Sequence, residues 1–409
     1  MIKKSGGFSM LTTKQLDKYA DILIWGVKTA RTKQYKKNDI VMVHYDLPTI
    51  KLAEILHEKL LDLGINPVLR LGLAVAMEKI FYKKANQNQL VFQAPGTKEL
   101  FESLNGIIYL HAPESLTHLK DIDPKRIAKA LIARKPFRDI LSRREEIGEF
   151  GWTLCTLPTL ELAKQARLSF EEYTQQIVRA CYLDASNPVK AWNTLYTRAQ
   201  TIKKWLNSMK VNWYHIESRN IDLRITPGEQ RRWIGISGHN IPSFELFLSP
   251  DWRGTEGTYF ANQSSFRSGN YVKGVRLEFK KGSVTKIKAE KGEDFTIKQL
   301  AMDTGANKVG EFSLTDRRFS KIDKFMANTL FDENFGGTSG NCHIAVGSSY
   351  SDTYRGNPAE LTHEKKKHLG FNDSALHWDL VNTEEKVVTA HLFSGKKIII
   401  YEKGEFKYQ

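Results

Sequence analysis

Five side chains able to bind a divalent metal occur in the second half of this 409-residue chain, each within an apolar stretch. Glu245 lies in IPSFELFLSP, Glu311 in VGEFSL and His343 in CHIAVGSSY, while His377 and Asp379 share ALHWDLV. Because residues i and i+2 of a strand point to the same face, ALHWDLV would present an imidazole and a carboxylate together. A carboxylate in apolar surroundings is costly unless it is paired or bound to a metal.

Each candidate also has a simpler explanation. Glu245 could lie on the solvated face of a strand, and Glu311 could pair with either arginine of the nearby segment TDRRF. His343 could be a hydrogen-bonded core histidine, and the His-Asp pair of ALHWDLV could bond only to itself. Tyr350, seven residues after His343, could be an ordinary loop residue.

Taken together, the five groups form a set that suits metal chemistry. Mixed carboxylate and imidazole ligands favour Zn²⁺, Mn²⁺ or Co²⁺. A catalytic zinc keeps about three protein ligands, so five groups indicate two metals, about 3.5–4 Å apart and sharing one carboxylate. The residues alone therefore indicate a dinuclear hydrolase and leave its substrate open.

The elements that must position these residues differ between the two halves of the chain. In the first half, β-branched runs alternate with segments of helical period, beginning with a capping box at Thr12. Expected strands cover residues 40–45, 67–71, 106–111 and 152–157. This alternation predicts an α/β domain with a doubly wound, mostly parallel sheet. No Gly-x-Gly-x-x-Gly or P-loop motif follows these strands, so nothing supports nucleotide binding.

After about residue 211 strand-like pieces dominate, at residues 213–217, 221–225 and 233–237. A hairpin is expected over residues 275–289, turning at Lys281-Gly282. We therefore predict two domains, residues 1–210 as the α/β N-terminal domain and residues 211–409 as a β-rich α+β domain that holds the metals.

Composition narrows the class of protein. No run of about 18 apolar residues is present, which argues against a transmembrane helix, and the N-terminus has no apolar core of a signal peptide. Three scattered cysteines fit a reducing compartment, so we expect a cytoplasmic protein with no membrane partner. The net charge of +15 is spread along the whole chain, and we expect no nucleic-acid partner.

The order of motifs in the second half resembles the thermophilic-type metalloaminopeptidases, the aminopeptidase T/S family of bacteria (peptidase family M29). The similarity begins at Asn240-Ile241-Pro242 leading to Glu245, and continues at Gly310-Glu311-Phe312. It then runs through 332–338 (DENFGGT) and 343–350 (HIAVGSSY) to His377-Trp378-Asp379. Weaker similarity reaches the first expected helix, so the match covers nearly the whole chain.

The resemblance implies an aminopeptidase that removes the N-terminal residue from short peptides through water activated by two divalent metals (Zn, Co or Mn). It implies that the metals are held by Glu245, Glu311, His343, His377 and Asp379, with Glu311 as the bridging carboxylate. Glu333 matches an acidic family position that is either a sixth ligand or the proton-handling group. Tyr350 matches a family tyrosine that stabilises the reacting carbonyl. The resemblance also implies a homodimer.

Three departures from the family pattern bear on the site. Three extra residues precede His343, which puts the preceding loop and the role of Glu333 in question. Phe244 replaces a glycine before the first glutamate and predicts a reshaped substrate pocket, and residues 220–223 (NIDL) replace Gly-Thr-Asp-Leu. Two other functions remain as alternatives: a non-catalytic basic protein that binds nucleic acid, and a dinuclear phosphoesterase.

Overall fold

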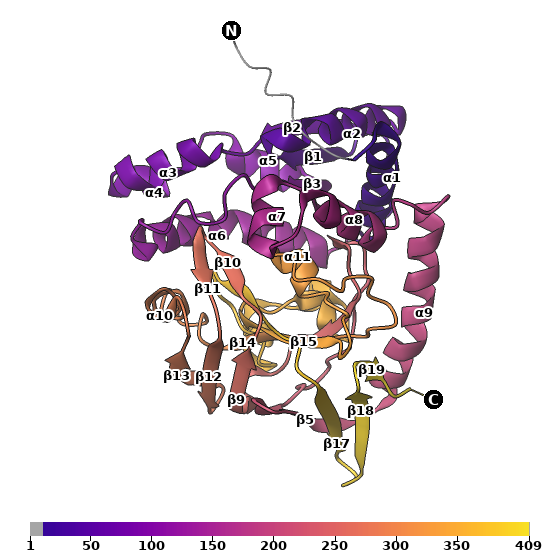
Figure 1. Ribbon diagram of the computed structural model, residues 1–409, viewed down its shortest axis with the longest axis vertical. Helices are drawn as coiled ribbons and strands as arrows, with labels where there is room; N and C mark the ends of the chain where they lie inside the picture. The colour runs from indigo at the N-terminus through magenta and orange to yellow at the C-terminus, as the bar shows by residue number, and fades with distance from the viewer. Residues whose placement is uncertain (1–10, 409) are drawn as a thin grey trace.

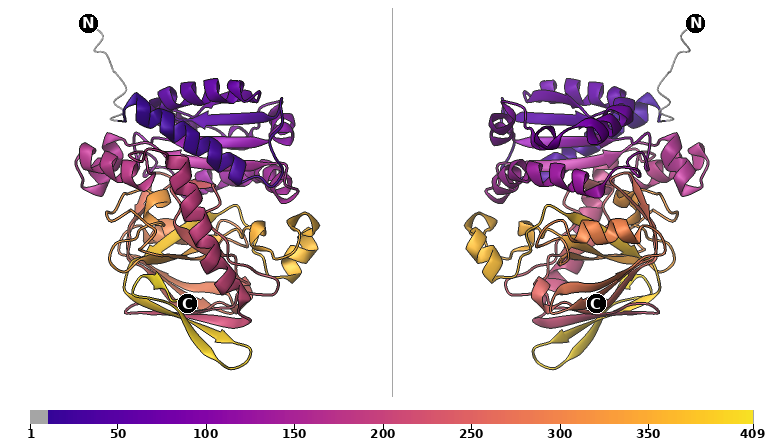
Figure 2. Two further views of the ribbon diagram at one scale, coloured as in Figure 1. Left: turned by 90° about the vertical axis from the view of Figure 1, so that its right-hand side faces the viewer. Right: turned by 90° about the vertical axis from the view of Figure 1, so that its left-hand side faces the viewer.

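The computed structural model describes residues 11–408, which form two stacked halves (Figures 1 and 2). Residues 1–10, where the sequence lacks the apolar core of a signal peptide, lie outside the described part. Within residues 11–408, no helix is long and apolar enough to cross a membrane. The N-terminal half lies above the C-terminal half in Figure 1, and helix α9 runs down one side of the molecule.

The N-terminal half is built on a five-stranded, wholly parallel sheet of order β2-β1-β3-β4-β7. Its strands are β1 (Ile40–Tyr45), β2 (Asn66–Leu71), β3 (Gly106–His111), β4 (Gly151–Thr156) and β7 (Asn240–Ile241). The last of these comes from beyond residue 211, so the second half of the chain completes this sheet. The expected strands of the first half are confirmed.

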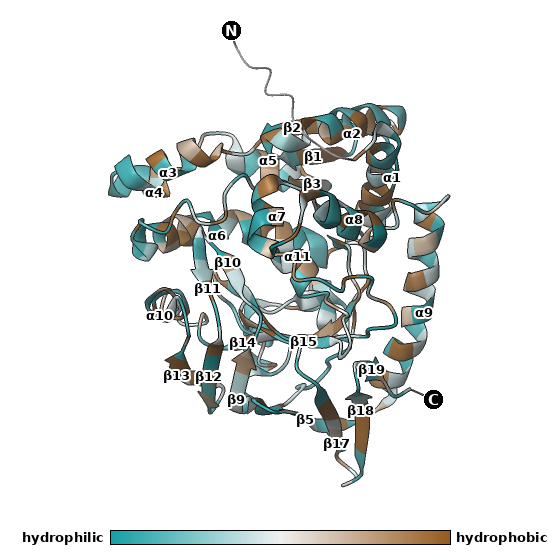
Figure 3. Cartoon of the chain, in the orientation of Figure 1, coloured by the Kyte–Doolittle hydropathy of each residue, from teal (hydrophilic) through white to brown (hydrophobic). Residues whose placement is uncertain are grey.

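Helices pack on both faces of the parallel sheet. On one face Val41 and Val43 of β1 share a core with α1 (Thr13–Thr29) and α2 (Ile50–Asp62). On the other face Met42 packs with Leu141 of α6 (Pro124–Glu146). Both α1 and α2 carry apolar and polar residues side by side, as Figure 3 shows. The expected capping box is confirmed, since Thr12 Oγ1 accepts from the backbone N–H of Gln15.

The remaining helices are mostly short and surround these layers. They are α3 (Val75–Lys84), α4 (Gln87–Val91), α5 (Thr97–Ser103), α7 (Leu160–Ala166), α8 (Phe170–Ala180), α9 (Pro188–Ser208), α10 (Glu293–Leu300), α11 (Thr329–Asp332) and α12 (His363–His368).

The C-terminal half contains antiparallel sheets. The largest has the order β13-β12-β9-β6-β5-β17-β18-β19, with β5 (Val211–Ser218), β6 (Asp222–Ile225), β9 (Glu256–Ala261), β12 (Val275–Lys280), β13 (Ser283–Lys288), β17 (Lys386–Leu392), β18 (Lys397–Glu402) and β19 (Glu405–Phe406). The second has the order β16-β15-β14-β8, with β8 (Glu245–Leu248), β14 (Val309–Thr315), β15 (Asn341–Gly347) and β16 (His377–Asn382). A separate hairpin pairs β10 (Ser265–Arg267) with β11 (Asn270–Val272).

Buried tyrosines tie the two antiparallel sheets together. Tyr259 of the larger sheet donates to the backbone carbonyl of Leu380 at 2.6 Å, and Tyr401 donates to that of Thr315 at 2.7 Å. Because both acceptors lie in the four-stranded sheet, these bonds fix its position on the larger one. The larger sheet therefore holds the four-stranded sheet rigidly in place.

Two sequence expectations for this half have opposite outcomes. The hairpin over residues 275–289 is confirmed as β12 and β13. The strand expected at 233–237 is wrong, because this segment makes only an isolated bridge at Ile234. Gly235 and Ile236 have φ values of +128° and +51°, which are incompatible with an extended strand.

Candidate metal centre

The four-stranded sheet brings all five metal-binding side chains to one of its faces. Glu245 begins β8, Glu311 lies in β14, His343 in β15, and His377 and Asp379 in β16. Neighbouring strands in the order β16-β15-β14-β8 thus each supply at least one group. Rigid strands position such groups more precisely than loops do.

The register of the sheet explains why these side chains face the same way. Ser313, two residues after Glu311, pairs with His343, and Ala345 lies between Glu311 and Asp379. Because side chains alternate along a strand, the even spacing places all of them on one face. The opposite face is apolar and buried, and Trp378 packs there, 6.2 Å from Phe295 between ring centroids.

His343 lies at the centre of the cluster. Its Nε2 is 3.2 Å from Oε2 of Glu245, 2.9 Å from Oε1 of Glu311 and 3.9 Å from Oδ1 of Asp379. His377 Nε2 lies 3.3 Å from Oδ1 of Asp379 and 3.9 Å from Oε2 of Glu311. Ligand atoms of Glu245, Glu311 and His343 all fall within 4.8 Å of one another. The cluster therefore has the size of a metal site.

The simpler explanations for the two glutamates do not describe this arrangement. Glu245 is only 5% exposed, so it does not lie on a solvated face. The arginines of TDRRF are engaged elsewhere: Arg317 pairs with Glu405, and Arg318 pairs with Asp316. Glu311 faces the two histidines instead.

The atoms around the cluster fit metal binding. His377 Nδ1 lies 2.9 Å from the backbone carbonyl of Ser348, so an N–H there donates to it and leaves Nε2 free as a ligand. Ser313 Oγ donates to Oε2 of Glu245 at 2.8 Å. Within residues 11–408, the buried Nδ1 of His343 has no partner. Carboxylates and imidazoles oriented in this way suit a borderline divalent cation.

Burial and mutual repulsion set the protonation of the cluster. Burial raises the pKa of the Glu245 carboxyl to about 7, against the effect of His343 and with that of Glu311. Burial lowers the pKa of His343, but Glu245 and Glu311 outweigh it and raise this pKa to about 9. Burial also raises the pKa of Asp379, but His377 and His343 lower it to about 2. Without a metal the cluster must hold protons to offset its negative charge.

Glu333 and Tyr350 approach the cluster from outside the sheet. Glu333 follows α11, and its Oε1 accepts from Nδ2 of Asn240 at 3.0 Å. Burial, followed by the negative charges of Glu245 and Asp379, raises the pKa of Glu333 well above its ordinary value. The ring of Tyr350 packs edge-on against His377, with centroids 4.8 Å apart. Burial raises the pKa of Tyr350, so its hydroxyl keeps its proton at neutral pH.

The structure shows where two of the departures from the family pattern lie. The three extra residues fall within residues 339–342, at the start of β15, and leave His343 in register with Ser313. Glu333 lines the same cavity as the metal-binding carboxylates. Phe244, which was predicted to reshape the substrate pocket, does not itself line the cavity that contains the metal-binding carboxylates. Phe244 is fully buried and stacks on Trp192 of α9, with centroids 5.8 Å apart.

The cluster opens into a cavity of about 670 Å³ between the two halves, which we call the inner cavity. Its walls include Glu333, Tyr350 and, from the carboxyl ends of the parallel strands, His111 and Thr156. Ligands of parallel α/β sheets commonly bind at these strand ends. A second, outer cavity of about 1640 Å³ adjoins it, with Tyr350 and His377 in both linings.

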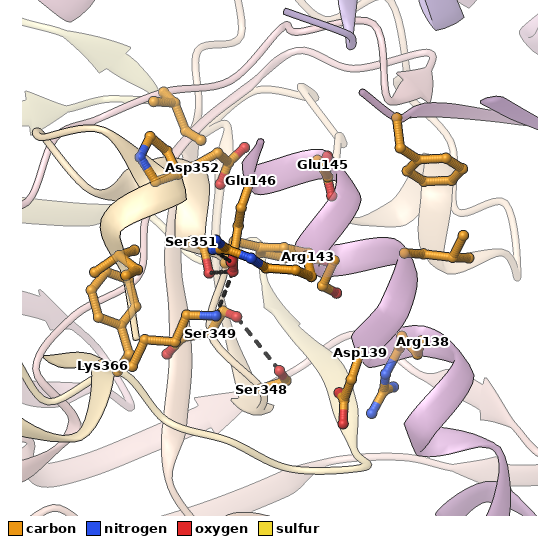
Figure 4. A pocket seen from close by; sticks show the side chains of 18 of the residues that line it. Arg138, Asp139, Arg143, Glu145, Glu146, Ser348, Ser349, Ser351, Asp352 and Lys366 are labelled. Atoms are coloured by element: carbon orange, nitrogen blue, oxygen red, sulfur yellow. Dashed lines mark hydrogen bonds and ion pairs between the residues drawn. The ribbon is translucent and has the colours of Figure 1, made fainter. Parts of the chain in front are cut away.

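The outer cavity lies between α6 and residues 348–373, as Figure 4 shows. Glu146 of α6 is buried and contacts Ser351 and Lys366 across the cavity wall. The neighbouring Glu145 binds Nε2 of His239 at 2.8 Å. None of these groups could be predicted from the sequence, because a polar residue on a long basic helix carries no signal of what it contacts.

The chain is similar to known proteins over most of its length. The family model of thermophilic metalloproteases (M29) matches residues 12–406. Over 339 residues the chain is 27% identical to Aminopeptidase 2 of Geobacillus stearothermophilus, covering 78% of this chain and 80% of that protein. It is 28% identical over 309 residues to Aminopeptidase T of Thermus aquaticus, covering 70% and 73%. The solved structure of wild-type AmpT from Thermus thermophilus has the same fold, with a TM-score of 0.76 at 21% identity, covering 97% of this chain and 100% of that one.

Proposed function

The chain belongs to the family of thermophilic metalloproteases, M29, and from this premise we propose how it acts as a metalloaminopeptidase. It removes the N-terminal residue of short peptides with the help of two divalent metals. Glu245, Glu311, His343, His377 and Asp379 would hold these metals. The resemblance of the whole chain to peptidases favours this reaction over phosphoester hydrolysis and over a non-catalytic role.

The observation that carries the proposal is the grouping of five carboxylate and imidazole side chains on one sheet face, three of them buried and two, His377 and Asp379, half-buried. Glu311 has one carboxylate oxygen 2.9 Å from His343 Nε2 and the other 3.9 Å from His377 Nε2. Its two oxygens thus face the two histidines separately, which is the arrangement a bridging carboxylate needs. We therefore assign the bridging role to Glu311.

Two divalent metals at this site would polarise the peptide carbonyl and lower the pKa of a bound water. The Tyr350 hydroxyl, protonated and beside His377, donates a hydrogen bond to the carbonyl oxygen as negative charge develops there. Glu333, held by Asn240, handles the proton that must reach the leaving amine. We assign Glu333 to proton transfer because burial and the neighbouring carboxylates raise the pKa of its carboxyl well above the ordinary value, so that it can carry a proton.

The position of the site in a cavity between the two halves limits the substrate. An inner cavity of about 670 Å³ has the size of sites for small ligands. Short unfolded peptides fit it, whereas the N-terminus of a folded protein is held away by the cavity walls. Removal of only the N-terminal residue follows if the free amine binds in this acidic end of the cavity.

The proposal is tested by metal removal and by substitution at Glu311. Chelated protein should lose peptidase activity, and Zn²⁺, Co²⁺ or Mn²⁺ should restore it with two ions per chain. Metal binding should also raise Tm, because a ligand that binds only the folded state stabilises it. Released amino acid is measured by chromatography and bound metal by elemental analysis.

Glu311→Gln is expected to lose activity by at least about 100-fold. Its circular dichroism spectrum should match that of the wild type. A folded, metal-loaded Glu311→Gln protein with full peptidase activity would contradict the assignment.

A further inference from the structure

The hairpin of β10 and β11 reaches from the C-terminal half to the N-terminal half. Its turn, Ser268-Gly269, has positive φ at both positions (+47° and +68°), as a two-residue type I′ turn requires. A Cβ on Gly269 would lie 2.5 Å from the backbone nitrogen of Leu119, so the tip rests directly on the N-terminal half. The hairpin is thereby fixed, and its residue Arg267 lines the inner cavity.

The guanidinium of Arg267 has unused hydrogen-bond donors. Among residues 11–408, its side chain makes no hydrogen bond or ion pair, and its Nε is buried without a partner. The Trp378 ring supports it from one side, with Cζ 5.5 Å from the ring centroid. A buried N–H without an acceptor is costly, and the other guanidinium N–H groups of this half-buried side chain have no acceptor among residues 11–408 either. Such a group is stabilised once an acceptor enters the cavity.

The charges of the residues that line the inner cavity indicate which kind of acceptor Arg267 would bind. Arg267 is the only lysine or arginine among the described residues that line the inner cavity. The same lining contains seven carboxyl groups: Asp46, Glu145, Glu245, Glu311, Glu333, Asp352 and Asp379. An anionic group of a bound molecule would be repelled by most of this wall. Apart from the metal centre, the group that would attract this anion is the guanidinium of Arg267.

We propose that Arg267 is the receptor for the C-terminal carboxylate of short peptide substrates. This inference rests on the proposed function, because it places the N-terminus of the same peptide at the metal centre. A guanidinium matches a carboxylate with two parallel N–H···O bonds, which a neutral terminal amide cannot reproduce. The substrate class is therefore peptides short enough for both ends to lie within the inner cavity.

The experiment compares peptides with free and amidated C-termini. The series from dialanine to penta-alanine, each with its C-terminal amide, is assayed with the metal-loaded wild type. We expect kcat/KM to favour the free acid by about 10- to 100-fold at one or two chain lengths. The preference should disappear at longer lengths, where the carboxylate lies beyond Arg267. A ratio near one at every length would overturn the proposal.

Arg267→Gln should remove the preference by slowing hydrolysis of the acids, through KM, while leaving the amides nearly unchanged. Arg267→Lys should retain part of it, since it keeps the charge without the paired donors. Arg219→Gln is the matched control, because Arg219 is exposed in the turn after β5 and its loss removes the same charge. A preference that survives in Arg267→Gln would contradict the assignment.

A purely structural role gives a different result. If Arg267 served only to balance Asp379, then Arg267→Gln would slow acids and amides equally and would lower the metal content measured by elemental analysis. That outcome would also overturn the proposal.

Binding provides a measurement that is independent of turnover. Calorimetry on metal-loaded Glu311→Gln should show tighter binding of trialanine than of trialaninamide, and Arg267→Gln in the same background should abolish the difference. If the wild type hydrolyses none of the peptides, the short-peptide function fails. The same calorimetry on the wild type then decides whether Arg267 binds carboxylates.

Discussion

The proposed role of Tyr350 depends on a single group, its hydroxyl. Its ring is wedged between His377 and Phe247, with centroid distances of 4.8 and 5.8 Å. Its backbone N–H donates to Ser249 Oγ at 2.8 Å, which fixes the start of the loop. The ring and the backbone therefore position the hydroxyl, and removal of the hydroxyl alone leaves both supports in place.

Tyr350→Phe should accordingly lower kcat while changing KM little. Loss of one preorganised donor to a developing oxyanion typically costs about 100- to 1000-fold in kcat. Steady-state kinetics with a short peptide measure both constants. Tyr354→Phe is the control, because Tyr354 is also buried in this loop but does not line either cavity. An unchanged kcat in Tyr350→Phe would exclude the role of its hydroxyl.

At the residue scale, the sequence predicted best where a polar side chain interrupts an apolar strand. Glu245, Glu311 and His343 stood out for this reason, and the structure brings them together. Arg267 did not stand out, because the segment SSFRSGNY reads as an ordinary polar hairpin. Its position in the cavity depends on the docking of the hairpin tip on Leu119, which is a contact between distant parts of the chain.

At the scale of elements, α6 braces the metal-binding half from across the cavities. Arg138 donates to the backbone carbonyls of Ser374 and Ala375, at 2.8 and 3.2 Å, just before the strand that carries His377. At the other end of the helix, Glu145 binds His239, whose Nδ1 lies 2.7 Å from Ser237 Oγ. The contacts of α6 involve residues about 100 to 240 positions away, which no local sequence pattern can predict.

The Glu145–His239 pair should make this brace dependent on pH. Burial lowers the pKa of His239, but Glu145 outweighs it and raises this pKa above the ordinary value of 6.5. A histidine whose pKa is raised by folding stabilises the folded state fully below its unfolded pKa. This contribution is lost as the pH rises through the folded value.

His239→Gln should therefore destabilise the protein more at pH 5.5 than at pH 9, by about 1 kcal/mol. Differential scanning fluorimetry of wild type and variant at both pH values measures the difference in Tm. His368→Gln is the control, since His368 is exposed at the end of α12. Equal decreases in Tm at both pH values would show that the ion pair contributes nothing.

In the whole molecule, one edge of the parallel sheet carries several exposed apolar side chains. Within residues 11–408, β2 is one of the two edge strands of this sheet, and β7 is the other. β2 and the following α3 expose five large aliphatic side chains, from 46% for Leu69 to 61% for Met77; the others are Leu71, Leu73 and Ile80. Several exposed aliphatic side chains within a short stretch of chain are typical of a contact between proteins. We propose that a second copy of the chain covers it, in line with the homodimer that the family resemblance implies.

Met77→Glu combined with Ile80→Glu should convert this dimer to monomer, because each contact between two copies would bury four added charges. Size-exclusion chromatography with light scattering should give the wild type twice the 46.8 kDa mass of the chain, and the double variant the single mass. Phe393→Glu is the matched control, since Phe393 is 73% exposed in the turn between β17 and β18, far along the chain from α3. It should remain dimeric. A monomeric wild type, or a double variant that stays dimeric, would show that the surface of β2 and α3 is not the interface.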